Sequence, residues 1–288
     1  MDIAKNWEDY EILDMSNGEK LERWGEVKLI RPDPQIIWKE KLHNQKWEQA
    51  DARYIRSKTG GGAWEYKNKI PSSWQIKYKE LTFNVKPMGF KHTGIFPEQA
   101  VNWDWMIEKI KNRKKEGKEV KVLNLFAYTG GATVACLYAE ASVCHVDSSK
   151  AIVAWAKENV VSSGLETKPV RFLIDDVIKF VSREIRRGNK YDAIIMDPPS
   201  YGRGTNGEVW QFEENIEDLV KLCKEVLSDN PLFFLINSYT TGISSTVLSN
   251  ILRIHIGEGK VTCGELGLPM TNSENVLPCG IYGRWEQE

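Results

Sequence analysis

Long hydrophobic runs are absent from this 288-residue sequence. The longest, near Leu232 to Ile236, is far shorter than the ~20 apolar residues that cross a bilayer. The first residues are acidic and lack an apolar core, so we expect no signal peptide. Cysteine is also scarce: there are 5, with no Cys-x-x-Cys pair. This argues against structural zinc and is typical of reduced thiols. We therefore expect a cytoplasmic protein without a membrane or metal partner.

A strong overall charge is missing as well, because the net charge is −1. Its distribution is uneven: residues 38–91 hold 12 Lys and Arg against 5 Asp and Glu, and residues 109–121 hold 7 against 2. A nucleic-acid-binding protein needs only one basic face, since phosphate contacts are local. Solvated surface is an equally good interpretation of the lysine-rich stretches.

The chain divides into two regions. Residues 1–95 are predicted to be rich in short strands, with a hairpin turn at Ser16-Asn17-Gly18. A helix is expected at 97–112, and strands and helices then alternate. The expected strands are 120–126, 142–147, 170–175, 191–197 and 231–237, with two more near 261–266 and 276–285. Such alternation predicts an α/β fold with a parallel sheet covered by helices on both faces. Ligands bind such sheets beyond the carboxyl ends of the strands.

The first strand end reads NLFAYTGGATVA. Gly130 and Gly131 let the backbone approach a ligand at the start of a helix. A tight strand–helix turn would need the same glycines for geometry alone. There is no Gly-x-Gly-x-x-Gly pattern, so a dinucleotide pyrophosphate site is poorly supported.

Acidic residues follow the next two strands. Asp147 can accept both hydroxyl groups of a ribose; the alternative is that it caps the next helix, although Ser148 and Ser149 are competing caps. Either Asp175 or Asp176 can accept the amino group of an adenine. For at least one of this pair, we expect the simpler role of complementing a helix dipole.

The fourth strand end, Met196 to Ser200, reads MDPPS. Pro198 and Pro199 fix a rigid loop and remove two backbone donors. Carbonyl oxygens beside the Asp197 carboxylate then form a corner that only accepts hydrogen bonds. Such a corner suits an amino or ring-nitrogen group of a substrate, or an amine of the bound ligand itself. A turn without function is the alternative.

Together, VLNLFAYTGG, HVDSS, IDD and DPPS at successive strand ends resemble the class I methyltransferases that use S-adenosylmethionine. More narrowly, they resemble the bacterial 23S ribosomal RNA methyltransferases of the RlmI and RlmK type, which KHTGIFPEQAVNWDW (Lys91 to Trp105) also resembles. The resemblance covers about residues 80–240. It implies a Rossmann-like domain with a seven-stranded, mostly parallel sheet at 96–288. A smaller β-rich domain at 1–95 would bind substrate or RNA. A PUA-like RNA-binding domain is not recognisable.

The resemblance also implies roles for individual residues. The methionine end of the cofactor would be lined by Phe126, Ala127, Tyr128, Gly130 and Gly131. Its ribose would be bound by Asp147 with Ser148, and its adenine by Asp176 or Asp175. The methyl acceptor would face Asp197, Pro198 and Pro199. The segment that closes over the cofactor would contribute Thr93, Gly94, Phe96 and Gln99, although Phe96 fits core packing equally well.

The lack of a cysteine after the fourth and fifth strands bears on which atom is methylated. Methylation of cytosine carbon 5 requires a cysteine that first adds to the ring. Relatives of that type carry it after the fourth or fifth strand, where this chain has DPPS and INSYTTG. We therefore predict a nitrogen acceptor, most simply a base of ribosomal RNA.

The loop after DPPS offers further candidates for substrate contact: Tyr201, Arg203 and Trp210. Trp210 and Phe212 could stack on a base, or they could anchor the loop. Three rival functions stay open: methylation of a protein or small molecule, RNA binding without catalysis, and an NAD-dependent oxidoreductase.

Overall fold

The computed structural model describes residues 1–57, 61–203, 209–240 and 242–287, without the side chain of Arg203. The chain forms two compact units. The smaller unit comprises Asp2–Ala100 and Gly267–Cys279. The larger comprises Met1, Val101–Leu266 and Gly280–Glu288. The sequence prediction placed residues 267–279 with the larger domain, whereas the structure groups them with the N-terminal residues.

The larger unit is built on seven strands in the order β16-β17-β15-β12-β9-β10-β11. Strands β9 to β12 and β15 run parallel to one another, and β17 is antiparallel to β15. The bounds are β9 Lys121–Leu125, β10 Ser142–Asp147, β11 Val170–Ile174, β12 Ala193–Met196, β15 Phe233–Ser238, β16 Lys260–Pro269 and β17 Val276–Glu286. The chain reverses its direction across the sheet between β9 and β12, which is where ligands bind in such sheets.

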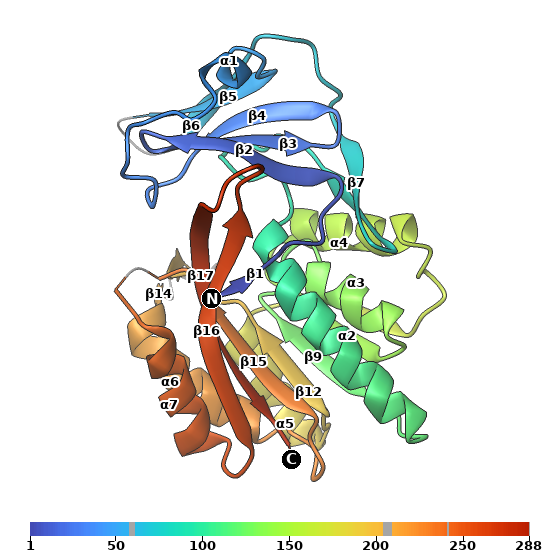
Figure 1. Ribbon diagram of the computed structural model, residues 1–288. Helices are drawn as coiled ribbons and strands as arrows, with labels where there is room; N and C mark the ends of the chain where they lie inside the picture. The colour runs from blue at the N-terminus through green and yellow to red at the C-terminus, as the bar shows by residue number, and fades with distance from the viewer. Residues whose placement is uncertain (58–60, 204–208, 241, 288) are drawn as a thin grey trace. The chain divides into compact units, whose positions relative to one another are not determined.

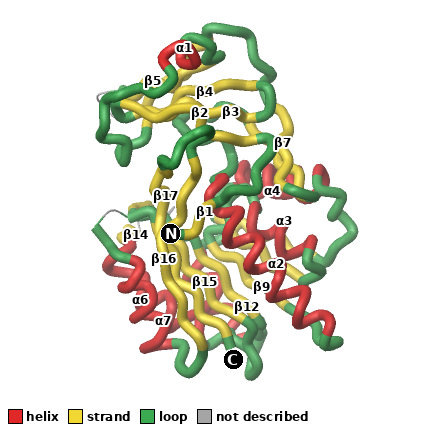
Figure 2. Tube along the Cα trace, viewed as in Figure 1, coloured by secondary structure: helices red, strands yellow, loops and turns green. Residues whose placement is uncertain are grey.

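Helices cover both faces of this sheet (Figures 1 and 2). One face carries α5, α6 and α7, whose apolar side chains share one core cluster with alternate strand residues such as Leu123, Val146 and Phe234. The other carries α2, α3 and α4. The bounds are α2 Ala100–Lys115, α3 Gly131–Tyr138, α4 Lys150–Ser162, α5 Val177–Arg187, α6 Phe212–Lys224 and α7 Ser245–His255. The predicted α/β architecture is thus confirmed.

The helix ends follow local sequence signals. The side chains of Ser149 and Asp176 accept from the backbone N–H groups of Ile152 and Lys179, which caps α4 and α5. Gly188 ends α5 with a φ of 69°. After β12 a small hairpin forms from β13 (Tyr201–Arg203) and β14 (Val209–Gln211). No helix in the described part of the chain is long and apolar enough to cross a membrane.

The smaller unit has a five-stranded sheet in the order β2-β3-β4-β5-β6, and a separate hairpin, β7-β8. Asn17 and Gly18 both have positive φ, 50° and 79°, as the tight turn between β2 and β3 requires. The unit also holds β1 (Asp2–Ile3), the short helix α1 (Asn44–Trp47) and the 3-10 turn η1 (Pro97–Gln99). The other bounds are β2 Tyr10–Ser16, β3 Glu19–Trp24, β4 Val27–Pro32, β5 Ala52–Arg56, β6 Gly62–Tyr66, β7 Trp74–Tyr78 and β8 Leu81–Val85.

Candidate active site

A cavity of about 500 Å³ lies in the larger unit, at the carboxyl ends of the parallel strands. That volume is within the range of pockets that hold drug-sized ligands and cofactors. Its walls come from four strand ends, the β13-β14 hairpin and α6: Phe126, Asp147, Ser148, Ile174, Asp175, Asp176, Val177, Ile178, Lys179, Pro199, Gly202, Val209, Trp210 and Asn215. Residues that the sequence analysis selected at four separate strand ends therefore meet at one cavity.

The loop from β9 to α3 has an unusual backbone. Phe126 and Tyr128 have φ values of 52° and 51°, which non-glycine residues seldom adopt. Gly130, with a φ of 83°, has a second constraint, because a Cβ there would lie 3.0 Å from the Cβ of Ala156. Such backbone conformations cost free energy and persist where the surrounding structure enforces them, often at functional sites. Of this loop, only Phe126 lines the cavity itself.

A buried polar network behind the loop holds it in place. The hydroxyl of Thr133, on α3, accepts from Asn124 Nδ2 at 2.9 Å and lies 2.9 Å from His145 Nδ1. Burial lowers the pKa of His145 to about 3, so its ring is neutral. On the other side, Asn159 donates to the carbonyl of Thr129 at 2.8 Å. Sequence reasoning missed this network, although Asn124 and His145, polar residues inside apolar strands, were its visible signal.

Asp147 joins the loop to the cavity. Its Oδ2 accepts from the backbone N–H of Tyr128 and its Oδ1 from that of Ser149, each at 2.9 Å. Burial raises the pKa of Asp147, while these two N–H groups oppose the rise. Each carboxylate oxygen has a further lone pair. Two more donors, such as neighbouring hydroxyls, would therefore complete its hydrogen bonding.

The two acidic residues that follow β11, Asp175 and Asp176, have different roles. Asp176 Oδ1 accepts from the backbone N–H of Lys179 and so caps α5, as expected for one member of the pair. Asp175 accepts from the backbone N–H of Asp176 and forms an ion pair with Arg183. Both line the cavity. Asp176, whose second oxygen is not used by the cap, is the better placed to accept from a ligand.

An apolar surface beside the acidic pair escaped the sequence analysis. Ile174 and Ile178 are 54% and 46% exposed, although both are large aliphatic residues, and Val177 lies between them in the cavity wall. Exposed aliphatic side chains next to hydrogen-bond acceptors suit a flat ring with polar edges. The signal in the sequence was an isoleucine at a strand end, four residues from a second one.

The corner after β12 is tied to the β13-β14 hairpin. The indole N–H of Trp210 donates to the carbonyl oxygen of Pro199 at 2.7 Å, and its ring lies 5.4 Å from that of Phe126. Trp210 therefore anchors the loop and also lines the cavity. Phe212 is fully buried in the core, which favours anchoring over stacking. Asp197 and Pro198 precede Pro199 directly.

The remaining predicted residues are less closely tied to the cavity. Tyr201 is 53% exposed, and the side chain of Arg203 lies outside the described residues, as does the loop at 204–208. Thr93, Phe96 and Gln99 belong to the smaller unit, whereas every residue that lines the cavity belongs to the larger one. Their contact with a cofactor stays a prediction.

This geometry agrees with comparisons to known proteins. Residues 51–244, more than half of the chain, match the sequence model of the S-adenosylmethionine-dependent methyltransferases. The chain belongs to this family. A solved structure from Agrobacterium tumefaciens, described as a SAM-dependent methyltransferase, is 35% identical and has a TM-score of 0.92. The match covers 98% of this methyltransferase and 91% of that chain.

Two curated relatives act, by their names, on ribosomal RNA. Ribosomal RNA large subunit methyltransferase I of Erwinia tasmaniensis is 35% identical over 129 residues, 44% of this chain and 32% of the relative. Methyltransferase K/L of Shewanella baltica is 33% identical over 127 residues, 44% of this chain and 16% of the relative. The chain thus spans a third or less of the curated relatives that it matches.

The cavity fits the cofactor of this family, S-adenosylmethionine. Asp147 has acceptor capacity for a ribose diol, and Ile174 and Ile178 offer apolar surface for a purine ring. The cofactor supplies an electrophilic methyl group when it is bound. The residues of the chain bind it, orient it and align it with the acceptor.

Proposed function

We propose that this methyltransferase transfers a methyl group to a base nitrogen in ribosomal RNA. The observation that carries the proposal is that Pro199, the last residue of the Asp197-Pro198-Pro199 segment after β12, lines the cavity beside Trp210, from which its carbonyl oxygen accepts a hydrogen bond. Methyl transfer is a direct displacement, so alignment supplies much of the rate enhancement. A carboxylate that accepts an N–H of the base would orient the nitrogen lone pair toward the methyl group and would take up the proton that this nitrogen loses on methylation.

We assign the remaining roles by the same reasoning. Asp147, with Ser148 beside it, binds the ribose. Asp176 accepts the adenine amino group. Phe126, Ala127, Tyr128, Gly130 and Gly131 surround the methionine end of the cofactor. Tyr201 and Trp210 contact the substrate, and the contacts of Thr93, Phe96, Gln99 and Arg203 stay predictions from the sequence. The cavity wall supports the assignments of Phe126, Asp147, Ser148, Asp176 and Trp210, which line it.

Nitrogen is preferred over cytosine carbon 5 because no thiol is suitably placed. Cys136, Cys144 and Cys223 are buried, and burial raises the pKa of Cys144 to about 11. Cys263 and Cys279 lie in β16 and β17, and burial raises the pKa of Cys279 well above its usual value. A nucleophilic thiolate requires a lowered pKa instead.

Ribosomal RNA is supported by the names of the curated relatives and by the basic residues at 38–91. A cytoplasmic location follows from such a substrate.

The proposal is tested by incubating the purified chain with methyl-labelled S-adenosylmethionine and separate RNA, protein and small-molecule fractions. All three fractions come from cells that lack this protein. We expect label in RNA, in one nitrogen-methylated nucleoside. Asp197→Asn should lower the rate by about 10²–10⁴-fold while it still binds the cofactor. Label in protein or in a small molecule, with none in RNA, would overturn the proposal.

A further inference from the structure

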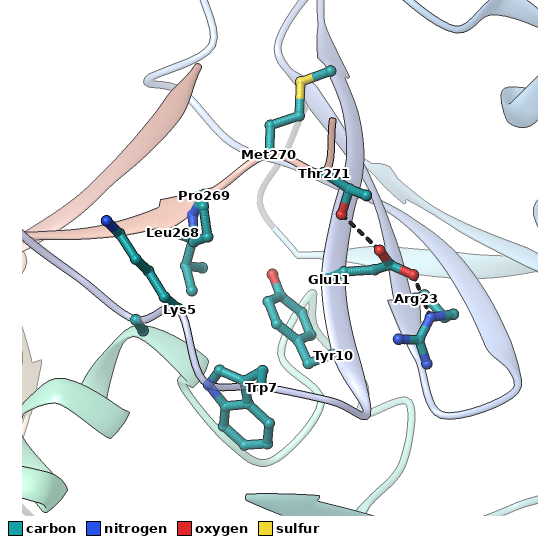
Figure 3. Close-up of a pocket in the computed structure, with 10 residues that line it drawn as sticks. Lys5, Trp7, Tyr10, Glu11, Arg23, Leu268, Pro269, Met270 and Thr271 are labelled. Carbon is teal, nitrogen blue, oxygen red and sulfur yellow. Dashed lines mark hydrogen bonds and ion pairs between the residues drawn. The ribbon is translucent and has the colours of Figure 1, made fainter. Parts of the chain in front are cut away.

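A second cavity, of about 180 Å³, lies wholly within the smaller unit (Figure 3). Its walls come from three stretches of the sequence: the segment 4–11, Arg23 on β3, and residues 268–271, which form the end of β16 and the two residues after it. The cavity thus joins the N-terminal segment to the distant stretch that the structure groups with it.

Two aromatic rings in its wall are held rigidly. The indole N–H of Trp7 donates to the carbonyl of Pro97 at 2.9 Å, and the hydroxyl of Tyr10 donates to Glu22 at 2.7 Å. The two rings meet edge to face, with centroids 6.0 Å apart. In Figure 3, Tyr10 lies between Leu268 on one side and Glu11 on the other. The cavity is therefore preformed, with aromatic and aliphatic walls.

A fixed carboxylate occupies its polar side. Glu11 accepts from Arg23 Nε at 2.5 Å and from the hydroxyl of Thr271 at 2.6 Å (Figure 3). Burial alone would raise the pKa of Glu11, but these hydrogen bonds lower it below its usual value. The carboxylate therefore stays ionised, and each oxygen still has a lone pair for an amino group of a ligand.

Lys5 lines the same cavity, and its charge is not paired with any described residue. Lys5 is exposed, and no described residue forms a hydrogen bond or ion pair with its ammonium group. Arg23, by contrast, also donates to the carbonyls of Gly25 and Glu8. Lys5 is thus the cation available for an anionic group on a ligand.

We propose that this cavity binds one base of a single-stranded RNA segment, with the adjoining phosphate on Lys5. The volume is below the ~300 Å³ of typical small-molecule pockets, so it admits one planar ring system rather than a whole cofactor. Aromatic walls with a hydrogen-bonding edge are how proteins recognise unpaired bases. Glu11 selects bases that carry an amino group. The inference rests on the proposed RNA substrate and adds a binding site separate from the methyl-transfer cavity.

The test measures binding of a fluorescein-labelled six-nucleotide RNA of mixed sequence to the full chain by anisotropy. Lys5→Ala should weaken binding about fivefold and reduce the slope of log K against log salt by about 0.7, the value for one phosphate contact on a single strand. Lys5→Arg should restore both. Lys69→Ala, an exposed lysine of the same unit that does not line the cavity, should change neither.

A second measurement locates the base. An RNA that contains 6-thioguanosine, a photoreactive base that keeps an exocyclic amino group, should cross-link to Trp7 or Tyr10 on irradiation, as mapped by mass spectrometry. Thr271→Val, which removes one hydrogen bond to Glu11, should weaken binding without changing the salt slope. If Lys5→Ala binds like the wild type, or the cross-links map elsewhere while rRNA is still methylated, the inference fails and the proposed function stands. If RNA is neither bound nor methylated, both fail.

Discussion

The two units of this methyltransferase differ in where their sheets carry ionisable groups. In the smaller unit, charges lie within the fold: Glu22 is fully buried, and Arg31 donates to both of its oxygens at 2.6 and 2.7 Å. In the larger unit, the sheet interior holds a neutral network, Asn124–Thr133–His145, and the carboxylates stand at the strand ends. Buried charge also supports the larger unit, where Glu184 on α5 accepts from the hydroxyl of Tyr191. The contrast therefore concerns these two sheets and the strand ends, and not every element of each unit.

The strongest test of this contrast is Glu22→Gln. It leaves the Arg31 guanidinium buried without its countercharge, which typically costs about 3–5 kcal/mol. Hydrogen exchange of peptides from β3 and β4 would report the loss of stability in the smaller unit. Glu19→Gln, on the same strand, breaks an ion pair with the half-exposed Arg53 and should cost under ~1 kcal/mol. Equal effects of the two substitutions would contradict a structural role for the buried charge.

The matching change in the larger unit is Asp147→Asn. It removes a charged acceptor from the cavity and should weaken S-adenosylmethionine binding by about 1–3 kcal/mol. Calorimetric titration measures the affinity, and hydrogen exchange checks that the fold of the larger unit is retained. Asp218→Asn, an exposed carboxylate on α6, should bind the cofactor normally. Unchanged affinity in Asp147→Asn would show that the ribose is bound elsewhere.

The His145 network of the larger unit and the Glu22–Arg31 pair of the smaller unit should lose stability at different pH values as the solution is acidified. The pKa of His145 is lowered to about 3, so its neutral form is favoured in the fold. The contribution of His145 to the free energy of unfolding is complete above about pH 6.5, the pKa of histidine in the unfolded chain. It declines by about 1.4 kcal/mol per pH unit as the pH falls toward 3. The pKa of Glu22 is lowered to about 2, so its contribution declines only below the unfolded pKa of about 4.5. Exchange of α3 peptides at pH 7 and 5.5, in the wild type and in His145→Asn, tests this. The variant should show the flatter pH dependence, and equal slopes would refute the assignment.

A smaller effect is expected from Trp210→Phe. The phenyl ring keeps its contact with Phe126 but loses the hydrogen bond to Pro199, which is worth about 0.5–1.5 kcal/mol. We expect the methylation rate to fall a few-fold while cofactor affinity stays within twofold. The reverse pattern, a loss of affinity at an unchanged rate, would place Trp210 at the cofactor rather than at the acceptor corner.

The strand ends of the larger unit could be predicted from the sequence, whereas the contacts that build the smaller unit could not. Strand periodicity and the residues after each strand were sufficient for the parallel sheet and for Asp147 and Asp176 at the cavity, because parallel strands end at one edge. Phe126 was selected only through the resemblance to the methyltransferases. The grouping of residues 267–279 with the N-terminal unit was missed, because it depends on contacts between distant segments, such as that of Thr271 with Glu11. Buried pairs such as Glu22–Arg31 were missed because alternating charges on short strands look like surface.

The most direct test of the central claim is nucleoside analysis of ribosomal RNA from a strain that lacks the gene. The strain is complemented with either the wild type or Asp197→Asn. Our account predicts one nitrogen-methylated nucleoside that is absent from the deletion strain, restored by the wild type and not restored by Asp197→Asn. Loss of 5-methylcytosine instead, or full restoration by Asp197→Asn, would contradict it.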